Sequence, residues 1–204
     1  MTPFYHSTRS GAQSVTSKQA ILAGIAPDGG LYVSDGLGEK SVGLDVVCGQ
    51  GFRETARLVL GTLLPDYTAD ELTGCVEAAY GAQWDAPGVC PVTPLGADWL
   101  LELYHGPTCA FKDVALQMLP QLMSVARADD GRKIMVVTAT SGDTGKAALD
   151  GFAGVDGTGV TVFYPHGKVS DIQHLQMVTQ LGGNVAVCAV RGTFDDCQGE
   201  VKRI

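Results

Sequence analysis

The sequence is poor in positive charge. Its 204 residues include 14 Lys and Arg against 22 Asp and Glu, which gives a formal net charge of −8. Proteins that bind nucleic acids present an excess of Lys and Arg to the phosphate backbone, which an acidic surface repels. We therefore expect no nucleic-acid partner, and any anionic ligand has to be bound by local geometry.

Long apolar runs and a leader pattern are also missing. No apolar segment reaches membrane-spanning length without Gly, Pro or a charge, and residues 1–10 lack a basic start followed by an apolar stretch. We therefore expect a cytoplasmic protein with no membrane partner. The 45% share of hydrophobic residues is enough to build a real core.

Disulfide and metal patterns are absent as well. The six cysteines are scattered, with no C-x-x-C pair and no His at zinc-finger spacing. We expect reduced thiols, mostly in the core, and no metal site. The cysteines are Cys48, Cys75, Cys90, Cys109, Cys188 and Cys197.

The first half of the chain favours helices that serve packing. Apolar spacing and capping residues predict helices over residues 16–23, 51–64 and 68–80, the last with a Thr68/Glu71 capping box. Three prolines between residues 85 and 94 then indicate a boundary.

Beyond this boundary the pattern alternates between strands and helices, which predicts an α/β fold with a parallel sheet and right-handed crossovers. The expected strands are residues 99–104, 133–138, 159–164 and 184–190. The expected helices are residues 113–127, 141–152, 170–181 and one beginning near residue 194.

Lys112 occupies a position suited to covalent chemistry. It follows Phe111 at the start of the helix predicted from Asp113. Apolar neighbours remove water from its ammonium group, and a helix N-terminus disfavours positive charge, so both lower the pKa of the amine. A neutral amine can attack a carbonyl and form a Schiff base. The alternative is a lysine that merely begins a helix and keeps its charge in solvent.

The segment Ser141–Gly145 follows a predicted buried strand and begins a helix. Ligands of open α/β sheets collect at this edge. Its two glycines allow close backbone approach, successive N–H groups bind anions, and Ser141 and Thr144 add hydroxyl groups. We predict a carboxylate or phosphate site here. The alternative is that Ser141 or Asp143 is only a helix cap.

A nucleotide-binding P-loop does not fit the same segment, although Gly145-Lys146 resembles the end of one. The first glycine of that motif would fall at Thr140, and Ala147 stands where the motif needs Ser or Thr. We therefore reject a P-loop.

Two longer segments together carry a resemblance to a known family. Residues 102–113 (ELYHGPTCAFKD) and 138–145 (TATSGDTG) occur in this order, with residues 26–32 (APDGGLY) upstream and residues 164–170 (YPHGKVS) downstream. With these motifs the chain resembles threonine synthase, a pyridoxal-phosphate enzyme of the tryptophan-synthase-β fold (fold type II). The four segments spread the resemblance across nearly the whole chain.

The resemblance implies two domains. Residues 1–95 would form a partly helical N-terminal domain of the threonine synthase type. Residues 96–204 would form the first part of a three-layer parallel βαβ domain that binds pyridoxal phosphate, incomplete at its C-terminus.

The resemblance also implies a reaction, the last step of threonine biosynthesis. O-Phospho-L-homoserine and water would give L-threonine and phosphate, with pyridoxal phosphate as the electron sink. Lys112 would carry the cofactor as a Schiff base and then move protons at Cα and Cβ of the substrate.

Other residues receive roles from the same resemblance and from their positions. Asp143 stands where related enzymes commonly have Asn against the cofactor ring, so this contact involves a charged substitute. His105 could assist or could simply order its own turn, and His166, Lys168 and Ser170 could contact the leaving phosphate or lie in solvent. The expected cofactor-binding residues are Lys112, Asp143, Thr144 and Gly145, and the expected substrate-binding residues are Ser141, Gly142, His105, Thr108 and Lys168.

A second glycine-rich loop, for the phosphate of the cofactor, is expected further along but does not follow Gly183. We therefore interpret the chain as the N-terminal portion of a longer enzyme and expect it to bind the cofactor poorly and turn over little alone. The alternatives are a fragment without activity of its own, a threonine-synthase-like phospholyase or dehydratase, and a non-catalytic binding module.

Overall fold

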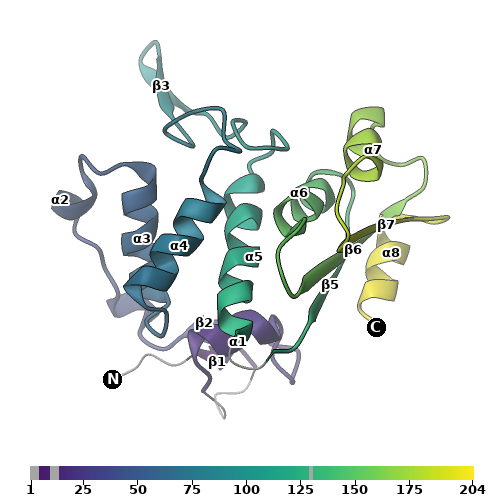
Figure 1. Ribbon diagram of the computed structural model, residues 1–204, viewed down its shortest axis with the longest axis horizontal. Helices are drawn as coiled ribbons and strands as arrows, with labels where there is room; N and C mark the ends of the chain where they lie inside the picture. The colour runs from purple at the N-terminus through teal and green to yellow at the C-terminus, as the bar shows by residue number, and fades with distance from the viewer. Residues whose placement is uncertain (1–4, 10–13, 129–130) are drawn as a thin grey trace.

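The computed structural model describes residues 5–9, 14–128 and 131–204. Figure 1 shows a mainly helical first half followed by alternating strands and helices. The helices are α1 (Ser17–Ala23), α2 (Leu44–Val47), α3 (Phe52–Leu63), α4 (Ala69–Ala79), α5 (Asp113–Arg127), α6 (Asp143–Phe152), α7 (Asp171–Val178) and α8 (Phe194–Val201). The strands are β1 (Tyr5–Ser7), β2 (Tyr32–Ser34), β3 (Val92–Leu95), β4 (Asp98–Leu101), β5 (Ile134–Ala139), β6 (Thr158–Pro165) and β7 (Val185–Val190). Within these described residues, no helix combines the length and apolar character needed to cross a membrane.

The predicted parallel sheet is confirmed. Strand β6 lies in the middle of the sheet and pairs in parallel with β5 on one side and β7 on the other. Helices α5 and α6 pack against one face and α8 against the other (Figure 1). Because parallel strands end at the same edge, the loops that follow β5 and β6 are brought side by side.

Helix α5 joins the two halves of the molecule. It packs against α4 on one side and α6 on the other, and α1 contacts its lower end in Figure 1. Its buried Met118 and Leu122 belong to a core cluster with side chains of α4, whereas Met123 belongs to a second cluster with Phe152 and Val162 of α6 and β6. The first turns of α5 lie against the last turn of α6, where Gln117 Nε2 donates to Oδ2 of Asp150 at 2.7 Å.

Local capping determines where the first helices begin. Thr16 and Thr68 each accept a hydrogen bond from the backbone N–H three residues later, and Gln19 and Glu71 return the bond to the cap residue. Each pair satisfies two backbone donors that a helix start leaves open. The predicted helices over residues 16–23, 51–64 and 68–80 are confirmed within one or two residues at each end.

The strand predicted over residues 99–104 is wrong in extent and in partner. Strand β4 covers only Asp98–Leu101, and it pairs antiparallel with β3 in a separate exposed hairpin. Gly96 has a φ of +65° in the two-residue turn between the strands, a conformation that glycine adopts without strain. Strand β4 therefore pairs with the segment nearest to it in sequence and takes no part in the parallel sheet.

Two smaller expectations also need correction. Helix α7 ends at Val178 instead of residue 181, with Thr179 as its C-cap residue. The cysteines are all free, but they are not mostly in the core. Cys75 and Cys197 are buried, Cys90 is half-buried, and the exposed ones are Cys48, Cys109 and Cys188.

Candidate active site

Lys112 lies at the N-cap of α5, where the chain turns from an irregular loop into the helix. The side chain is half-buried, and its Nζ lies 4.9 Å from the centroid of the Phe111 ring. Among the described residues, Nζ has no hydrogen-bond or ion-pair partner. The amine is therefore available to a ligand, and its role as a reactive lysine stays a prediction.

The next residue, Asp113, organises the loop before Lys112. Its side chain is fully buried, with 0% exposure. It accepts hydrogen bonds from the backbone N–H of Thr108 at 2.9 Å, from the Thr108 hydroxyl at 2.6 Å and from the N–H of Ala110 at 3.4 Å. A Cβ on Gly106 would lie 2.5 Å from Oδ2 of Asp113, so this position needs glycine. The Asp113 carboxylate thus fixes the conformation of residues 106–112.

Asp113→Asn is expected to lower the free energy of unfolding by about 1–2 kcal/mol. The side chain loses its charge, and an NH₂ group, which is a donor, replaces one of the two acceptor oxygens. The Thr108 hydroxyl can rotate to accept from the new amide, which keeps the loss moderate. Urea unfolding of the two proteins measures the difference. An unchanged midpoint would show that the carboxylate does not hold the loop.

The loop before α6 is organised by Thr140. Its hydroxyl oxygen accepts from the N–H of Gly142 at 3.0 Å and from the N–H of Gly145 at 2.9 Å. Gly142 has a φ of +151°, which favours glycine. In the described part of the chain, the N–H groups of Ser141, Asp143 and Thr144 have no acceptor. The predicted anion-binding segment therefore offers these three groups, whereas Thr140 occupies two of its glycine N–H groups.

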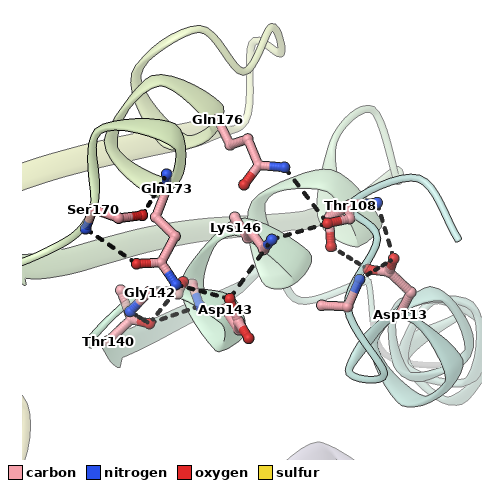
Figure 2. Close-up of polar contacts among 11 residues, drawn as sticks. Thr108, Asp113, Thr140, Gly142, Asp143, Lys146, Ser170, Gln173 and Gln176 are labelled. Carbon is pink, nitrogen blue, oxygen red and sulfur yellow. Dashed lines mark hydrogen bonds and ion pairs between the residues drawn. The ribbon is translucent and has the colours of Figure 1, made fainter. Parts of the chain in front are cut away.

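Helix α7 packs against the same loop. Gln173 Nε2 donates to Oδ1 of Asp143 at 2.9 Å, and Gln173 Oε1 accepts from the N–H of Ser170 at 3.2 Å (Figure 2). A Cβ on Gly142 would lie 2.3 Å from Gln173 Nε2, so the amide is packed directly against the loop. Gln173 was not predicted as a site residue, although the Ser-x-x-Gln spacing could have identified its capping box.

The two loops meet through Lys146, which the sequence analysis considered only for the rejected P-loop. Its Nζ donates to the carbonyl oxygen of Thr108 at 2.9 Å and lies 3.6 Å from Oδ1 of Asp143 (Figure 2). Gln176 Nε2 of α7 approaches the same Thr108 oxygen at 3.5 Å. Thr108, Asp143 and Gly142, which were predicted separately, thus lie in one connected group.

His105 lies three residues before Thr108, but its ring contacts residues outside this group. Its Nδ1 lies 2.5 Å from Oδ1 of Asp85, and its Nε2 lies 2.6 Å from Oε2 of Glu102. Both ring nitrogens are occupied, which favours the alternative in which His105 orders its own turn. His166 and Lys168 are exposed in the loop after β6, at the edge of the sheet where Ser141 also lies.

The His105 contacts predict a pH dependence of stability. Hydrogen bonds to Glu102 and Asp85 raise the pKa of His105 above its ordinary value of 6.5. A raised folded-state pKa gives stability that is fully present below about pH 6.5 and is lost as the pH rises through the folded-state value. We therefore expect the difference in unfolding free energy between the wild type and His105→Gln to shrink from about pH 6 to about pH 9. Urea unfolding across this range measures it, and parallel pH curves would contradict the assignment.

Comparison with known proteins places this geometry in context. Residues 4–80 match the family described as "Threonine synthase N terminus". The threonine synthase of Pseudomonas aeruginosa is 39% identical over 203 residues, which are 97% of this chain and 43% of that protein.

The chain is similar along its length to the N-terminal part of threonine synthase. The resemblance inferred from the motifs is thereby confirmed. The crystal structure of pyridoxal-phosphate-bound threonine synthase from Brucella melitensis matches with a TM-score of 0.89 and 37% identity, over 98% of this chain and 44% of that one. The threonine synthase of yeast matches with a TM-score of 0.89 and 32% identity, over 98% of this chain and 43% of that one. The chain thus spans less than half the length of these threonine synthases.

Proposed function

We propose that the protein serves as a threonine synthase, a lyase that converts O-phospho-L-homoserine and water to L-threonine and phosphate with pyridoxal phosphate bound to Lys112. The observation that carries this proposal is the juxtaposition of two loops through the contact between Lys146 and Thr108. One loop ends at an amine without a polar partner, and the other presents backbone N–H groups without acceptors, both judged over the described ranges. The similarity to threonine synthases supports the choice of reaction.

The residues present fit the carbonyl end of the cofactor. The Lys112 amine is free among the described residues to bond to an aldehyde carbon. Asp143, Thr144 and Gly145 start the helix beside it, and the absence of a side chain at Gly145 lets this turn pack within contact of Thr140 and Val162. The negative charge of Asp143, which replaces the amide expected in related enzymes, faces the Nζ of Lys146 at 3.6 Å and the amide of Gln173.

Each residue then has a definite task in the reaction. When bound, pyridoxal phosphate would supply an electron sink that makes the protons at Cα and Cβ of the substrate acidic. Lys112 Nζ removes and returns these protons as a general base and acid. The N–H groups of Ser141 and Thr144 hold the substrate carboxylate, and Thr108 and Gly142 line the same side. Lys168, exposed in the loop after β6, attracts the phosphate that leaves from Cγ.

The organisation of the chain follows from the same proposal. Residues 1–95 form the N-terminal unit of a threonine synthase, which the family match over residues 4–80 supports. Residues 96–204 form the first part of the fold type II domain with its three layers, which the parallel sheet between α6 and α8 supports. The enzyme works on a small soluble substrate in the cytoplasm.

Three substrates test the proposal against its alternatives. The purified protein is given pyridoxal phosphate together with O-phosphohomoserine, serine or threonine, and inorganic phosphate, threonine and 2-oxo acids are measured. From O-phosphohomoserine alone we expect phosphate and threonine in equal amounts, released slowly in keeping with the weak cofactor binding that the sequence predicts. A 2-oxo acid from serine or threonine would identify a dehydratase instead. A folded protein that neither changes the cofactor spectrum nor releases phosphate would favour a non-catalytic module.

A further inference from the structure

Lys146 is an unusually buried lysine. Only 7% of the residue is exposed, and it lies on the first turns of α6 among Gly145 and Ala147, which are also buried. Lysine is rarely buried unless its charge has a partner. The partners here are the carbonyl oxygen of Thr108 at 2.9 Å and the carboxylate of Asp143 at 3.6 Å (Figure 2).

We propose that Lys146 is a positioning residue that fixes the loop carrying Lys112 against the anion-binding loop before α6, through its bond to the Thr108 carbonyl and its contact with Asp143. This inference rests on the proposed function, because it gives Lys146 a task in that same site. Lys146 itself contacts neither the cofactor nor the substrate. Its task is to set the distance between the loop that carries Lys112 and the loop before α6.

Thr108 is the point at which this positioning reaches Lys112. The N–H and hydroxyl of Thr108 are bound by Asp113, the residue that follows Lys112, while its carbonyl is bound by Lys146. A shift of Thr108 is therefore transmitted through Asp113 to the backbone that carries the amine. Reactions that need an aligned nucleophile lose rate steeply when the geometry moves by about 1 Å.

Asp143 gives the same lysine a second task. The carboxylate lies at the start of a helix whose N–H groups are proposed to hold an anion, and an unbalanced negative charge there would repel that anion. Lys146 balances it from 3.6 Å, and Gln173 Nε2 donates to the same carboxylate oxygen at 2.9 Å (Figure 2). Without Lys146, the Thr108 carbonyl keeps, among the residues that the structure describes, only the weaker contact with Gln176 at 3.5 Å.

The test compares four proteins. Lys146→Met keeps the length of the side chain but removes the donor and the charge, and Lys146→Arg keeps both. Lys202→Met makes the same change at an exposed C-terminal lysine and serves as the matched control. Two measurements are made on each: amide hydrogen exchange of the segments 105–112, 141–146 and 69–79, and the rate at which pyridoxal phosphate is fixed to Lys112 by borohydride, counted by peptide mass.

We expect Lys146→Met to speed exchange about tenfold in residues 105–112 and 141–146 but not in α4, and to slow labelling of Lys112 by about tenfold. In Lys146→Arg, the exchange rates and the labelling rate should stay closer to those of the wild type than in Lys146→Met. Lys202→Met should behave as the wild type. A uniform rise of exchange that includes α4, or unchanged exchange in the two loops, overturns the positioning role. A wild type that takes no label at Lys112 overturns the proposed function instead, and the exchange data then decide the role of Lys146 by themselves.

Discussion

Lys112→Ala is expected to lower the rate of phosphate release from O-phosphohomoserine by about 10⁴-fold, because the same amine is proposed to serve as the attachment point of the cofactor and as the proton carrier. The variant should also lose the visible absorption band that the cofactor gains when it is bonded to the protein. Among the described residues, Nζ has no hydrogen bond or ion pair and lies 4.9 Å from the centroid of the Phe111 ring. An exposed contact of this kind contributes about 0.5–1 kcal/mol, so the fold should survive.

Two controls make this result specific. Lys133→Ala removes an exposed lysine before β5 and should leave the spectrum and the phosphate release unchanged. Thermal unfolding of Lys112→Ala should stay within roughly 2–4 °C of the wild type, as expected for a loss of about 1 kcal/mol in a chain of this size. Phosphate release above about a tenth of the wild-type rate would remove Lys112 from its catalytic role.

Gly151→Ala is expected to cost about 3 kcal/mol of unfolding free energy, which corresponds to roughly 6–12 °C in melting temperature. Gly151 lies on α6 where the helix crosses α5. A Cβ at this position would lie 2.0 Å from the carbonyl oxygen of Leu116 and 2.8 Å from its carbonyl carbon. These are backbone atoms that cannot rotate away, so the two helices would have to separate. Because Lys112 begins α5 and the anion-binding loop begins α6, labelling of Lys112 should fall as well.

Gly74→Ala provides the opposite control. Gly74 lies within α4, and nothing lies within 4 Å of a Cβ added there. Alanine is the better helix former by about 1 kcal/mol, so this variant should be slightly more stable than the wild type. Differential scanning calorimetry on both variants separates the steric effect from helix propensity. Equal melting temperatures for Gly151→Ala and the wild type would show that α5 and α6 do not pack as closely as described.

The features that depend on near neighbours could be predicted from the sequence. The capping boxes at Thr16 and Thr68 join residues only three positions apart, so their spacing is visible in the chain. The apolar run that became β5 identifies itself by composition, and the glycines after it mark where a ligand can approach. The two motifs around Lys112 and Ser141 also pointed to the threonine synthase resemblance, because they preserve residue types in order.

Other features could not be predicted because their partners are chosen by packing. The sequence presented residues 99–104 as a strand but could not say that β3 would pair with it. His105 looked like a candidate for catalysis until the fold placed Asp85, 20 residues away, against Nδ1 and Glu102 against Nε2. Nothing local distinguishes a free histidine from one between two carboxylates.

Lys112 shows the same division between what the sequence predicts and what the packing of the chain decides. By itself, the sequence determined that Lys112 stands at the start of a helix, and it predicts an anion-binding turn further along the chain. Only the tertiary structure decided how these parts meet, since Lys146 reaches a carbonyl oxygen 38 residues away and Asp113 turns back to hold Thr108. The physical reason is that a buried charge must find its partners in three dimensions, and helix packing, not sequence spacing, determines which groups lie within reach.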